Sequence, residues 1–211
     1  LPDGRLDEPA LRRLLAIQTA AKMDALVLLG TTGEPCTLSM DERERIIEIG
    51  LECTGGSIPV IVGTGSNDTR RAIEYARQAQ RLGAAGQLSV TPYYNKTTQS
   101  GLIRHYHAIL DACPLPMILY NVPGRTGMGL SADTAAALSR HPSVVGLKEA
   151  SGNSTLTGEI LEKTRGELPI YCGNDDQILP MMAQGSCGAI SGVSNILPDI
   201  TRALTRAWLE R

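Results

Sequence analysis

The sequence predicts an α/β fold in which parallel strands and helices alternate around a closed barrel, the (β/α)8 or TIM barrel. Short apolar runs alternate with helical patterns along the whole chain of 211 residues, and a cluster of small or reactive residues follows each run. This alternation requires parallel strands with right-handed crossovers, which a closed barrel or an open doubly wound sheet satisfies. An open sheet concentrates its chemistry at one switch point, whereas a barrel gathers all strand ends around one mouth. The clusters of small or reactive residues after every predicted strand therefore favour the barrel.

Seven segments have the character of buried strands. Each is short, rich in Val, Ile or Leu, and bounded by Gly, Pro or polar residues. They are residues 25–29, 58–62, 86–90, 117–120, 144–147, 169–172 and 188–190. The strand–helix unit repeats at somewhat under ~30 residues, about what an eight-stranded barrel of ~250 residues requires.

Helices are predicted between the strands from apolar residues spaced three and four apart. One begins around Leu11, and Ser39 followed by acidic residues caps a second. A third covers residues 68–82 and ends at Gly83, and a fourth covers residues 131–138. No linker, low-complexity segment or charge block divides the chain, so residues 1–211 are predicted to form a single (β/α) barrel domain.

An eight-stranded barrel needs one strand more than the seven found. That strand should precede the helix around Leu11, so we expect it to lie just before Leu1, while residues 203–211 end within an amphipathic helical pattern. The barrel is therefore expected to be incomplete at both ends. Without the missing strand, the strands around Val27 and Ala189 would expose unpaired edges that invite aggregation.

Composition excludes several classes of function. A formal net charge of −2 lacks the excess of basic residues that binding to nucleic acid or an acidic membrane requires. No apolar run is long enough to span a bilayer, and the start lacks the pattern of a signal peptide. Five cysteines without C-x-x-C spacing are typical of reduced thiols in a cytoplasmic protein.

No metal site is expected. His105 and His107 are two apart on a helix and therefore face different directions, and His141 precedes a proline. Asp175 and Asp176 are interpreted as the cap of a helix rather than as Mg²⁺ ligands.

Lys148 is the predicted catalytic residue. Of the four lysines, it alone directly follows an uninterrupted apolar run, Val144–Leu147. Desolvation there favours the neutral amine, which is the form that attacks a carbonyl to give a Schiff base. An ion pair in the barrel wall, or simple exposure at the strand end, would explain the same position, so the neighbouring strand ends have to decide.

Three neighbouring strand ends supply partners for this lysine. Tyr120 ends the preceding strand, where a phenol can carry protons if a relay fixes its own proton, and Thr31 and Tyr94 are candidate relay members. Thr31 and Thr32 offer hydroxyls and close backbone N–H groups suited to a carboxylate. Arg125 suits bidentate capture of a second carboxylate. Each alone also has a structural explanation: a core tyrosine, a tight turn, a solvated loop arginine.

With these segments, the chain resembles the dihydrodipicolinate synthase / N-acetylneuraminate lyase family of class I aldolase-like barrels. The motifs that carry the resemblance are Gly30–Glu34 (GTTGE), Thr91–Asn95 (TPYYN), Tyr120–Gly127 (YNVPGRTG) and Gly146–Ala150 (GLKEA). Compared with the family's pattern, the first strand and the C-terminal helical segment are expected to be missing from this sequence. Within it, the chain most resembles members that condense pyruvate with L-aspartate-4-semialdehyde to 4-hydroxy-tetrahydrodipicolinate in the diaminopimelate route to lysine.

The resemblance implies the catalytic roles. Lys148 matches the Schiff-base lysine and Tyr120 the proton donor and acceptor. Thr31 and Tyr94 match the relay partners, and Tyr94 would reach across a dimer interface. The implied enzyme is a homotetramer, built as a dimer of dimers, and it needs no metal or organic cofactor.

The resemblance also implies how substrates are held. Thr32 and the backbone of Ile190 match contacts to bound pyruvate, and Arg125 matches the receiver of the aldehyde's carboxylate. Another pyruvate-dependent aldolase of the family, acting on 4-hydroxy-2-oxoglutarate or sugar acids, is the alternative enzyme. A truncated chain that binds small carboxylates without catalysis is the alternative from another class.

Weak or absent inhibition by lysine is expected. In the family, lysine binds at the tight dimer interface, and Asn67 and Tyr93 match that pocket. Met40 and Arg71 stand where lysine-sensitive members have a histidine and an acid. A cation at Arg71 would disfavour an ammonium ligand.

Overall fold

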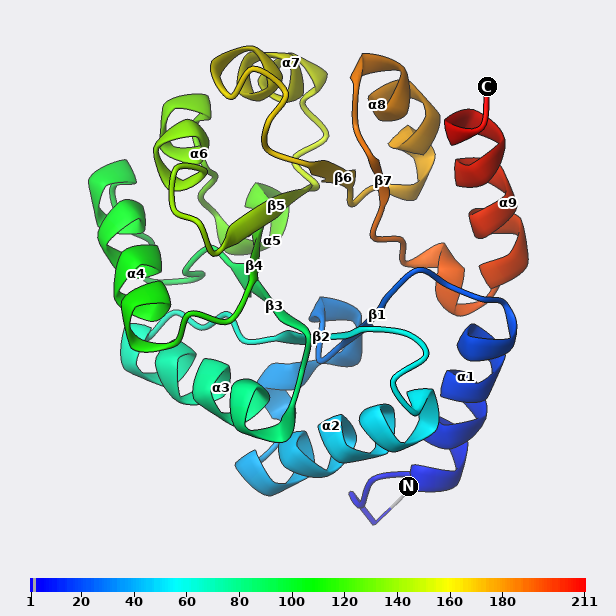
Figure 1. Ribbon diagram of the computed structural model, residues 1–211. Helices are drawn as coiled ribbons and strands as arrows, with labels where there is room; N and C mark the ends of the chain where they lie inside the picture. The colour runs from blue at the N-terminus through cyan, green and yellow to red at the C-terminus, as the bar shows by residue number, and fades with distance from the viewer. Residues whose placement is uncertain (2) are drawn as a thin grey trace.

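The computed structural model describes Leu1 and residues 3–211, and seven of their segments pair as one parallel sheet surrounded by helices (Figure 1). The strands are β1 (Leu26–Leu28), β2 (Val60–Gly63), β3 (Gly86–Val90), β4 (Met117–Asn121), β5 (Val144–Glu149), β6 (Ile170–Cys172) and β7 (Gly188–Ala189). They lie in the sheet in chain order, and every neighbouring pair is parallel. A doubly wound sheet would reverse its strand order at a switch point. The predicted TIM-barrel class is therefore confirmed.

The helices form the outer layer around the sheet (Figure 1). They are α1 (Glu8–Ala20), α2 (Met40–Thr54), α3 (Thr69–Leu82), α4 (Gln99–Ala112), α5 (Pro123–Thr126), α6 (Ala132–Leu138), α7 (Ser154–Lys163), α8 (Ile178–Gln184) and α9 (Pro198–Leu209). Short 3₁₀ turns follow three strands: η1 (Thr31–Gly33) and η2 (Pro35–Thr37) after β1, η3 (Asp175–Gln177) after β6, and η4 (Val193–Asn195) after β7. Among the described residues, no helix combines the length and apolarity needed to cross a membrane.

The predicted helix boundaries are confirmed where capping residues define them. Ser39 caps α2, because its hydroxyl accepts from the backbone N–H of Glu42 and the Glu42 carboxylate accepts from the N–H of Ser39. Gly83 ends α3 with a φ of 92°, a left-handed conformation that glycine adopts without steric cost. Ser131 caps α6 by accepting from Thr134.

Three strands run past their predicted ends, β2 by one residue to Gly63 and β4 and β5 into polar residues. β4 continues to Asn121 and β5 to Glu149, both fully buried polar residues that a pattern of apolar runs does not include. The Asn121 amide donates to the Glu149 carboxylate at 2.7 Å. Each of the two buried polar side chains has its hydrogen-bond partner in the neighbouring strand. The strands can therefore continue to pair through these polar residues.

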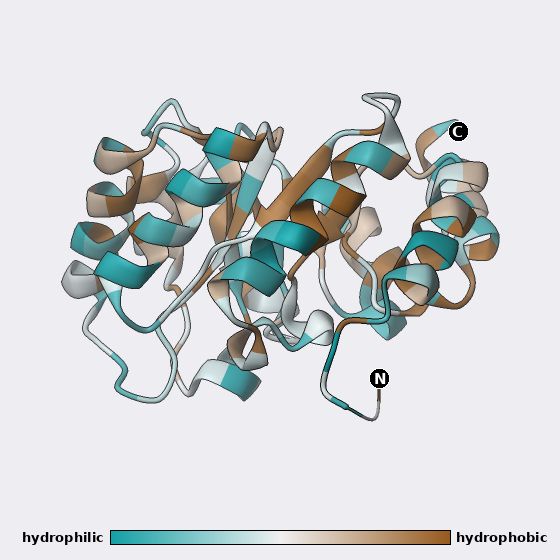
Figure 2. Ribbon diagram, turned by 90° about the horizontal axis from the view of Figure 1, so that it is seen from below, coloured by the Kyte–Doolittle hydropathy of each residue, from teal (hydrophilic) through white to brown (hydrophobic). Residues whose placement is uncertain are grey.

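Hydrophobic residues pack on both faces of the sheet, while polar residues gather on the outer faces of the helices (Figure 2). The larger cluster fills the space between sheet and helices. A smaller group, here called the interior cluster, lies on the inner face. It contains Leu88, Ile118, Tyr120 and Val122, with Val27, Ile61, Val90, Ala150 and Ile190 packed against them. The interior cluster forms a floor beneath the carboxyl ends of the strands.

Strand edges are unpaired where they were predicted. Within the described residues, β1 pairs only with β2 and β7 only with β6. The helical layer is nevertheless continuous there, because α9 lies beside the end of α1 (Figure 1). The Arg202 guanidinium donates to the carbonyl of Lys22 at 2.8 Å, and Arg206 forms an ion pair with Asp24. Side chains of α9 thus bind the loop that follows α1, although the end strands do not pair.

Candidate active site at the carboxyl ends of the strands

Lys148 lies on the inner face of β5, directly opposite Tyr120 of β4 in the register of the sheet. The register shifts at the start of this pair, and Val145 is left exposed there. The shift places Gly146 and Lys148 beside Ile118 and Tyr120, on the face that carries the interior cluster. Lys148 is therefore held at the barrel mouth above apolar side chains.

Burial sets the chemistry of the Lys148 amine. Desolvation lowers its pKa from 10.5 to about 8, because an ammonium is costly to bury. The Asp175 carboxylate acts in the opposite direction, and the Arg125 guanidinium adds to the lowering. A substantial fraction of this amine is therefore neutral slightly above neutral pH, as attack on a carbonyl requires.

Gly173, at the end of the neighbouring strand β6, leaves room for the lysine chain. A Cβ at this position would lie 3.0 Å from Cε of Lys148 and 2.7 Å from Cβ of Ala150. Both distances are shorter than ordinary carbon contacts, so any side chain here would displace the lysine.

Tyr120 lies beside the amine. The Lys148 Nζ is 4.5 Å from the centre of the Tyr120 ring. Burial raises the pKa of the phenol, while the Thr31 hydroxyl and the Arg125 charge act to lower it. A protonated phenol next to a partly neutral amine can supply and remove protons during carbonyl addition.

Thr31 and Thr32 form the first turn of η1, just beyond β1, and both are exposed at the mouth. The backbone there is tightly placed: Leu29 has a φ of 56°, and a Cβ on Gly63 would lie 1.9 Å from the Leu29 carbonyl oxygen. Such strained, closely packed backbone is typical of sites that position ligands. The structure thus brings Thr31 next to Tyr120 and Thr32 to the same rim.

Arg125 lies in the short helix α5, beyond β4, and its side chain is exposed at the mouth. The loop is fixed from below by Thr126, whose buried hydroxyl donates to the carbonyl of Met128 at 2.6 Å and accepts from Thr91 at 3.2 Å. The guanidinium acts on the pKa of both Lys148 and Tyr120. It is therefore positioned to receive an anionic substrate group near the amine.

Tyr94 is not brought to this site. Its side chain is 90% exposed and its φ is 69°, which is unusual for a bulky residue. The loop around it is held in place, since Asn95 donates through its side chain to the carbonyl of Asn67 at 3.2 Å. Tyr94 is thus presented outward from an ordered loop.

Ile190 follows β7 and packs against the interior cluster. Its backbone N–H donates to the carbonyl of Cys172 at 2.9 Å, so the sheet already uses this donor. The backbone contribution of Ile190 to a ligand would therefore come from its carbonyl oxygen.

The interpretation of Asp175 and Asp176 as a helix cap is wrong. No side chain caps the turn η3 that they begin. The Asp175 carboxylate instead accepts from the backbone N–H groups of Gly192 (3.2 Å) and Val193 (3.1 Å) and from the Ser191 hydroxyl. It thereby fixes the loop after β7 and also acts on the Lys148 amine. Its place directly after a strand was the available signal in the sequence.

Asn121 and Glu149 are a second feature that the apolar patterns miss. They lie on the face of the sheet opposite to Tyr120 and Lys148, and besides bonding each other they bind the loops that follow their strands. Asn121 accepts from the N–H of Leu130 at 2.9 Å, and Glu149 accepts from the N–H of Ser151. The pair fixes the ends of the two strands that carry the phenol and the amine.

Comparison with known proteins agrees with this arrangement. A model of the dihydrodipicolinate synthetase family matches residues 1–210. A relative from Exiguobacterium sibiricum, named 4-hydroxy-tetrahydrodipicolinate synthase, is 48% identical over 206 residues, which cover 98% of this chain and 70% of the relative.

Solved structures share the fold closely. A chloride-inhibited dihydrodipicolinate synthase from Acinetobacter baumannii, complexed with pyruvate, has a TM-score of 0.95 and 41% identity; the match covers 99% of this chain and 72% of that one. A dihydrodipicolinate synthase from Cyanidioschyzon merolae with lysine bound has a TM-score of 0.95 and 36% identity, with 100% and 72% covered. The synthases named among these relatives are lyases, and the predicted enzyme class is confirmed. The chain belongs to the dihydrodipicolinate synthetase family.

Proposed function

We propose that this chain condenses pyruvate with L-aspartate-4-semialdehyde to 4-hydroxy-tetrahydrodipicolinate, through a Schiff base on Lys148, in the diaminopimelate route to lysine. The observation that supports the proposal most strongly is the position of the Lys148 amine, whose Nζ lies 4.5 Å from the ring centre of Tyr120. Desolvation lowers the pKa of this amine to about 8. No other lysine in the described part of the chain lies within a strand.

The chemistry begins with attack of the neutral Lys148 amine on the keto carbon of pyruvate. Tyr120 supplies a proton to the carbonyl oxygen, which leaves as water and gives a protonated imine. The imine nitrogen draws electrons from the neighbouring methyl group, so that group loses a proton to form an enamine. Thr32 would donate its hydroxyl to the pyruvate carboxylate at the rim, while the carbonyl of Ile190, which can only accept, would face a protonated nitrogen of the adduct.

The enamine carbon then attacks the aldehyde of the second substrate. Arg125 would bind the carboxylate of the semialdehyde. The amine of the semialdehyde would then close the ring on the former keto carbon and release Lys148. The proton relay through Tyr120 would include Thr31 and the Tyr94 of a partner chain. The reaction as written uses protein side chains and substrate groups, without a metal or an organic cofactor.

Trapping with pyruvate and borohydride, followed by mass mapping, tests the covalent step. We expect reduction to fix a pyruvate-derived adduct on the peptide containing Lys148, and Lys148→Ala to abolish it. Lys163→Ala is the matched control, since Lys163 is an exposed lysine of α7 paired with Asp133, and it should label normally. A folded chain that gives no adduct would contradict the proposal and favour a non-catalytic carboxylate binder.

A second candidate within the family is an aldolase that accepts another aldehyde, such as a sugar aldehyde. Arg125 favours the semialdehyde, because a carboxylate-bearing acceptor needs a cationic receiver. Comparing kcat/KM for L-aspartate-4-semialdehyde and for sugar aldehydes decides between them. Arg125→Ala should raise the KM for the semialdehyde much more than that for pyruvate.

A further inference from the structure

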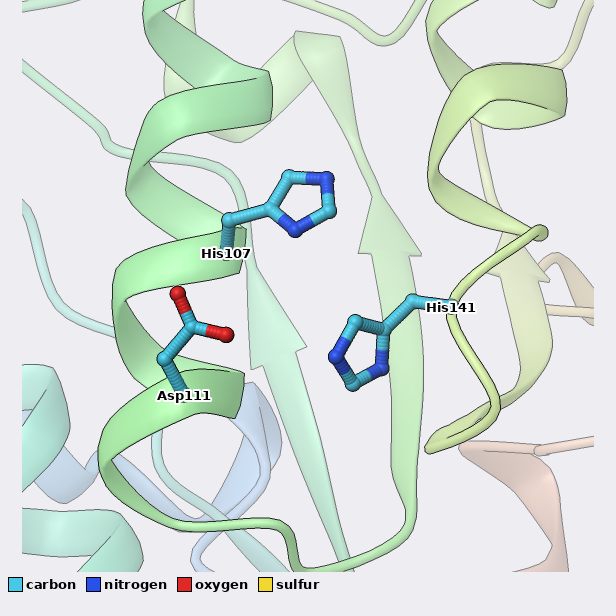
Figure 3. A group of neighbouring side chains, drawn as sticks. All are labelled: His107, Asp111 and His141. Atoms are coloured by element: carbon cyan, nitrogen blue, oxygen red, sulfur yellow. The ribbon is translucent and has the colours of Figure 1, made fainter.

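A second group of reactive side chains lies away from the barrel mouth, near the amino end of β5. His107 and Asp111 lie one turn apart on α4, and His141 lies in the segment that leads into β5 (Figure 3). One potential ligand atom of each residue lies within 4.8 Å of those of the other two. The two imidazole rings meet edge to face with their centres 5.7 Å apart. Two segments distant in sequence thus bring three donor groups together.

The expectation of no metal site rested on His105 and His107 facing different directions, which they do, and on His141 preceding a proline. His105 is buried, with its Nδ1 2.8 Å from the Thr69 hydroxyl. His107 instead shares a helix face with Asp111, because residues four apart in a helix are neighbours on its surface. The fold then adds His141 to this pair.

The donor set suits a transition metal. Two imidazoles and one carboxylate form three-ligand zinc sites that keep a position open for water, and imidazole nitrogen binds the late first-row divalent ions well. Around one ion with bonds of about 2.0–2.2 Å, ligand atoms stand roughly 3.4 Å apart. The groups would therefore have to approach one another by up to about 1.4 Å. Asp111 is exposed and both histidines are only half-buried, so side-chain rotation can supply this approach.

The present hydrogen bonds leave these groups available. Among the described residues, the side chains of His107 and Asp111 take part in no hydrogen bond or salt bridge. Nδ1 of His141 accepts from the backbone N–H of Ser143 at 3.2 Å, and the other ring nitrogen faces the open side of the group (Figure 3). Metal capture through that nitrogen moves the ring proton to Nδ1 and gives up this one long hydrogen bond.

We propose that His107, Asp111 and His141 form a binding site for one divalent transition-metal ion, with Zn²⁺ as the expected occupant. The ion would connect the second half of α4 to the segment entering β5. Lys148 lies at the opposite end of β5, so the ion would stabilise the fold rather than take part in the chemistry. An ion that binds only the folded chain raises its stability by mass action.

Isothermal titration calorimetry of the full chain with Zn²⁺ and with Ni²⁺ tests the site. We expect one ion per chain, and we expect His107→Ala and Asp111→Asn each to weaken binding by at least about tenfold, since loss of even an outer partner of a metal site costs 10–100-fold. Glu159→Gln, which changes an exposed acid on α7, is the matched control and should bind normally. Saturating Zn²⁺ should also raise the melting temperature of the wild-type chain and leave that of His107→Ala unchanged.

Exposed thiols are the competing explanation for zinc binding, because Cys36 and Cys187 are both exposed. Titration with Co²⁺ distinguishes binding by thiols from binding by the proposed site. Thiolate ligands give an intense charge-transfer absorption that imidazole and carboxylate ligands lack. For the wild-type chain we expect a Co²⁺ spectrum without the charge-transfer band. We expect His107→Ala to lose the spectrum of bound Co²⁺ altogether. No saturable binding by the wild-type chain, or binding that survives both His107→Ala and His141→Ala, overturns the proposal.

Discussion

At the scale of single residues, the partly buried amine of Lys148 is required for the proposed chemistry, and its desolvation opposes folding while it is protonated. Its pKa is lowered from 10.5 to about 8 by burial, so the folded chain binds the lysine proton more weakly than the unfolded chain does. Below pH 8 both states carry the proton and the folded state bears the full penalty. As the pH rises from about 8 to above 10.5, the penalty disappears.

Lys148→Met should therefore stabilise the chain at neutral pH while abolishing adduct formation. A pKa lowered from 10.5 to about 8 corresponds to roughly 3 kcal/mol, which is the upper limit of the expected gain in the free energy of unfolding. Urea denaturation at pH 7 and at pH 10.5 measures it, and the difference between the variant and the wild type should shrink at the higher pH. An unchanged or lower stability of the variant at pH 7 would show that burial of the ammonium is not a net cost.

Gly173 gives a prediction about positioning. Gly173→Ala places a methyl group 3.0 Å from Cε of Lys148 and 2.7 Å from Ala150, so the lysine chain must move. We expect borohydride trapping with pyruvate to slow by at least tenfold, because an error of about 1 Å in a reacting group can cost about 100-fold. Gly158→Ala is the control: nothing lies near its added methyl on α7, and it should trap normally and gain up to about 1 kcal/mol of stability. Equal trapping rates in the two variants would contradict this role.

At the scale of secondary structure elements, the ends of β4 and β5 depend on one buried hydrogen bond. The Asn121 amide donates to Glu149 at 2.7 Å, and both side chains are fully buried. Because the two strands carry Tyr120 and Lys148 on their other face, this bond also fixes the proposed catalytic pair.

Asn121→Leu should destabilise the chain by about 3 kcal/mol, because it leaves a buried carboxylate without one of its partners. Glu149→Gln keeps the shape and one acceptor oxygen and removes the buried charge, but its new NH2 group must face a donor, the Asn121 amide or the Ser151 N–H, so we expect a smaller but measurable loss. Chemical denaturation of both variants measures the difference. A milder effect for Asn121→Leu than for Glu149→Gln would mean that the Ser151 N–H alone satisfies the carboxylate.

At the scale of the whole molecule, we predict that a complete site needs a second chain, because the family resemblance gives Tyr94 a relay role and its side chain is exposed here. Its side chain is 90% exposed on an ordered loop, and its relay role remains a prediction. If Tyr94 of one chain completes the site of its partner, two inactive variants can complement each other.

Co-expression of Lys148→Ala and Tyr94→Phe chains with different tags tests this. Each variant alone should be nearly inactive, and the purified mixture should recover about one quarter of the wild-type activity. In a random mixture half of the dimers are mixed, and each of those holds one complete site of two. Sedimentation velocity of the wild-type chain should show dimers or the proposed dimer of dimers. Activity of the mixture no higher than that of the separate chains would place Tyr94 outside the partner's site.

Inhibition by lysine is the second prediction at this scale. Arg71 forms an ion pair with Glu74 at 3.1 Å and remains partly exposed, so it is a cation at the position where the family resemblance places an acid of the lysine pocket. We expect steady-state activity to be insensitive to added lysine, and Arg71→Glu to increase the sensitivity. Strong inhibition of the wild-type chain at low lysine would overturn this.

The sequence by itself determined the elements and their order. Apolar runs of strand length, helix caps such as Ser39 and a left-handed end such as Gly83 depend on interactions within a few residues, so they can be read without the fold. Lys148 could be singled out as a candidate in the same way, because it directly follows an apolar run, although that position alone did not separate catalysis from an ion pair or exposure.

Only the tertiary structure decided which side chains meet. The register of β4 with β5 sets Tyr120 opposite Lys148, and the same register buries the bond between Asn121 and Glu149. Asp175 bonds the loop after another strand instead of its own helix, and His141 joins two residues of α4. These contacts connect segments far apart in the chain. They depend on strand register and helix packing, which no local pattern encodes.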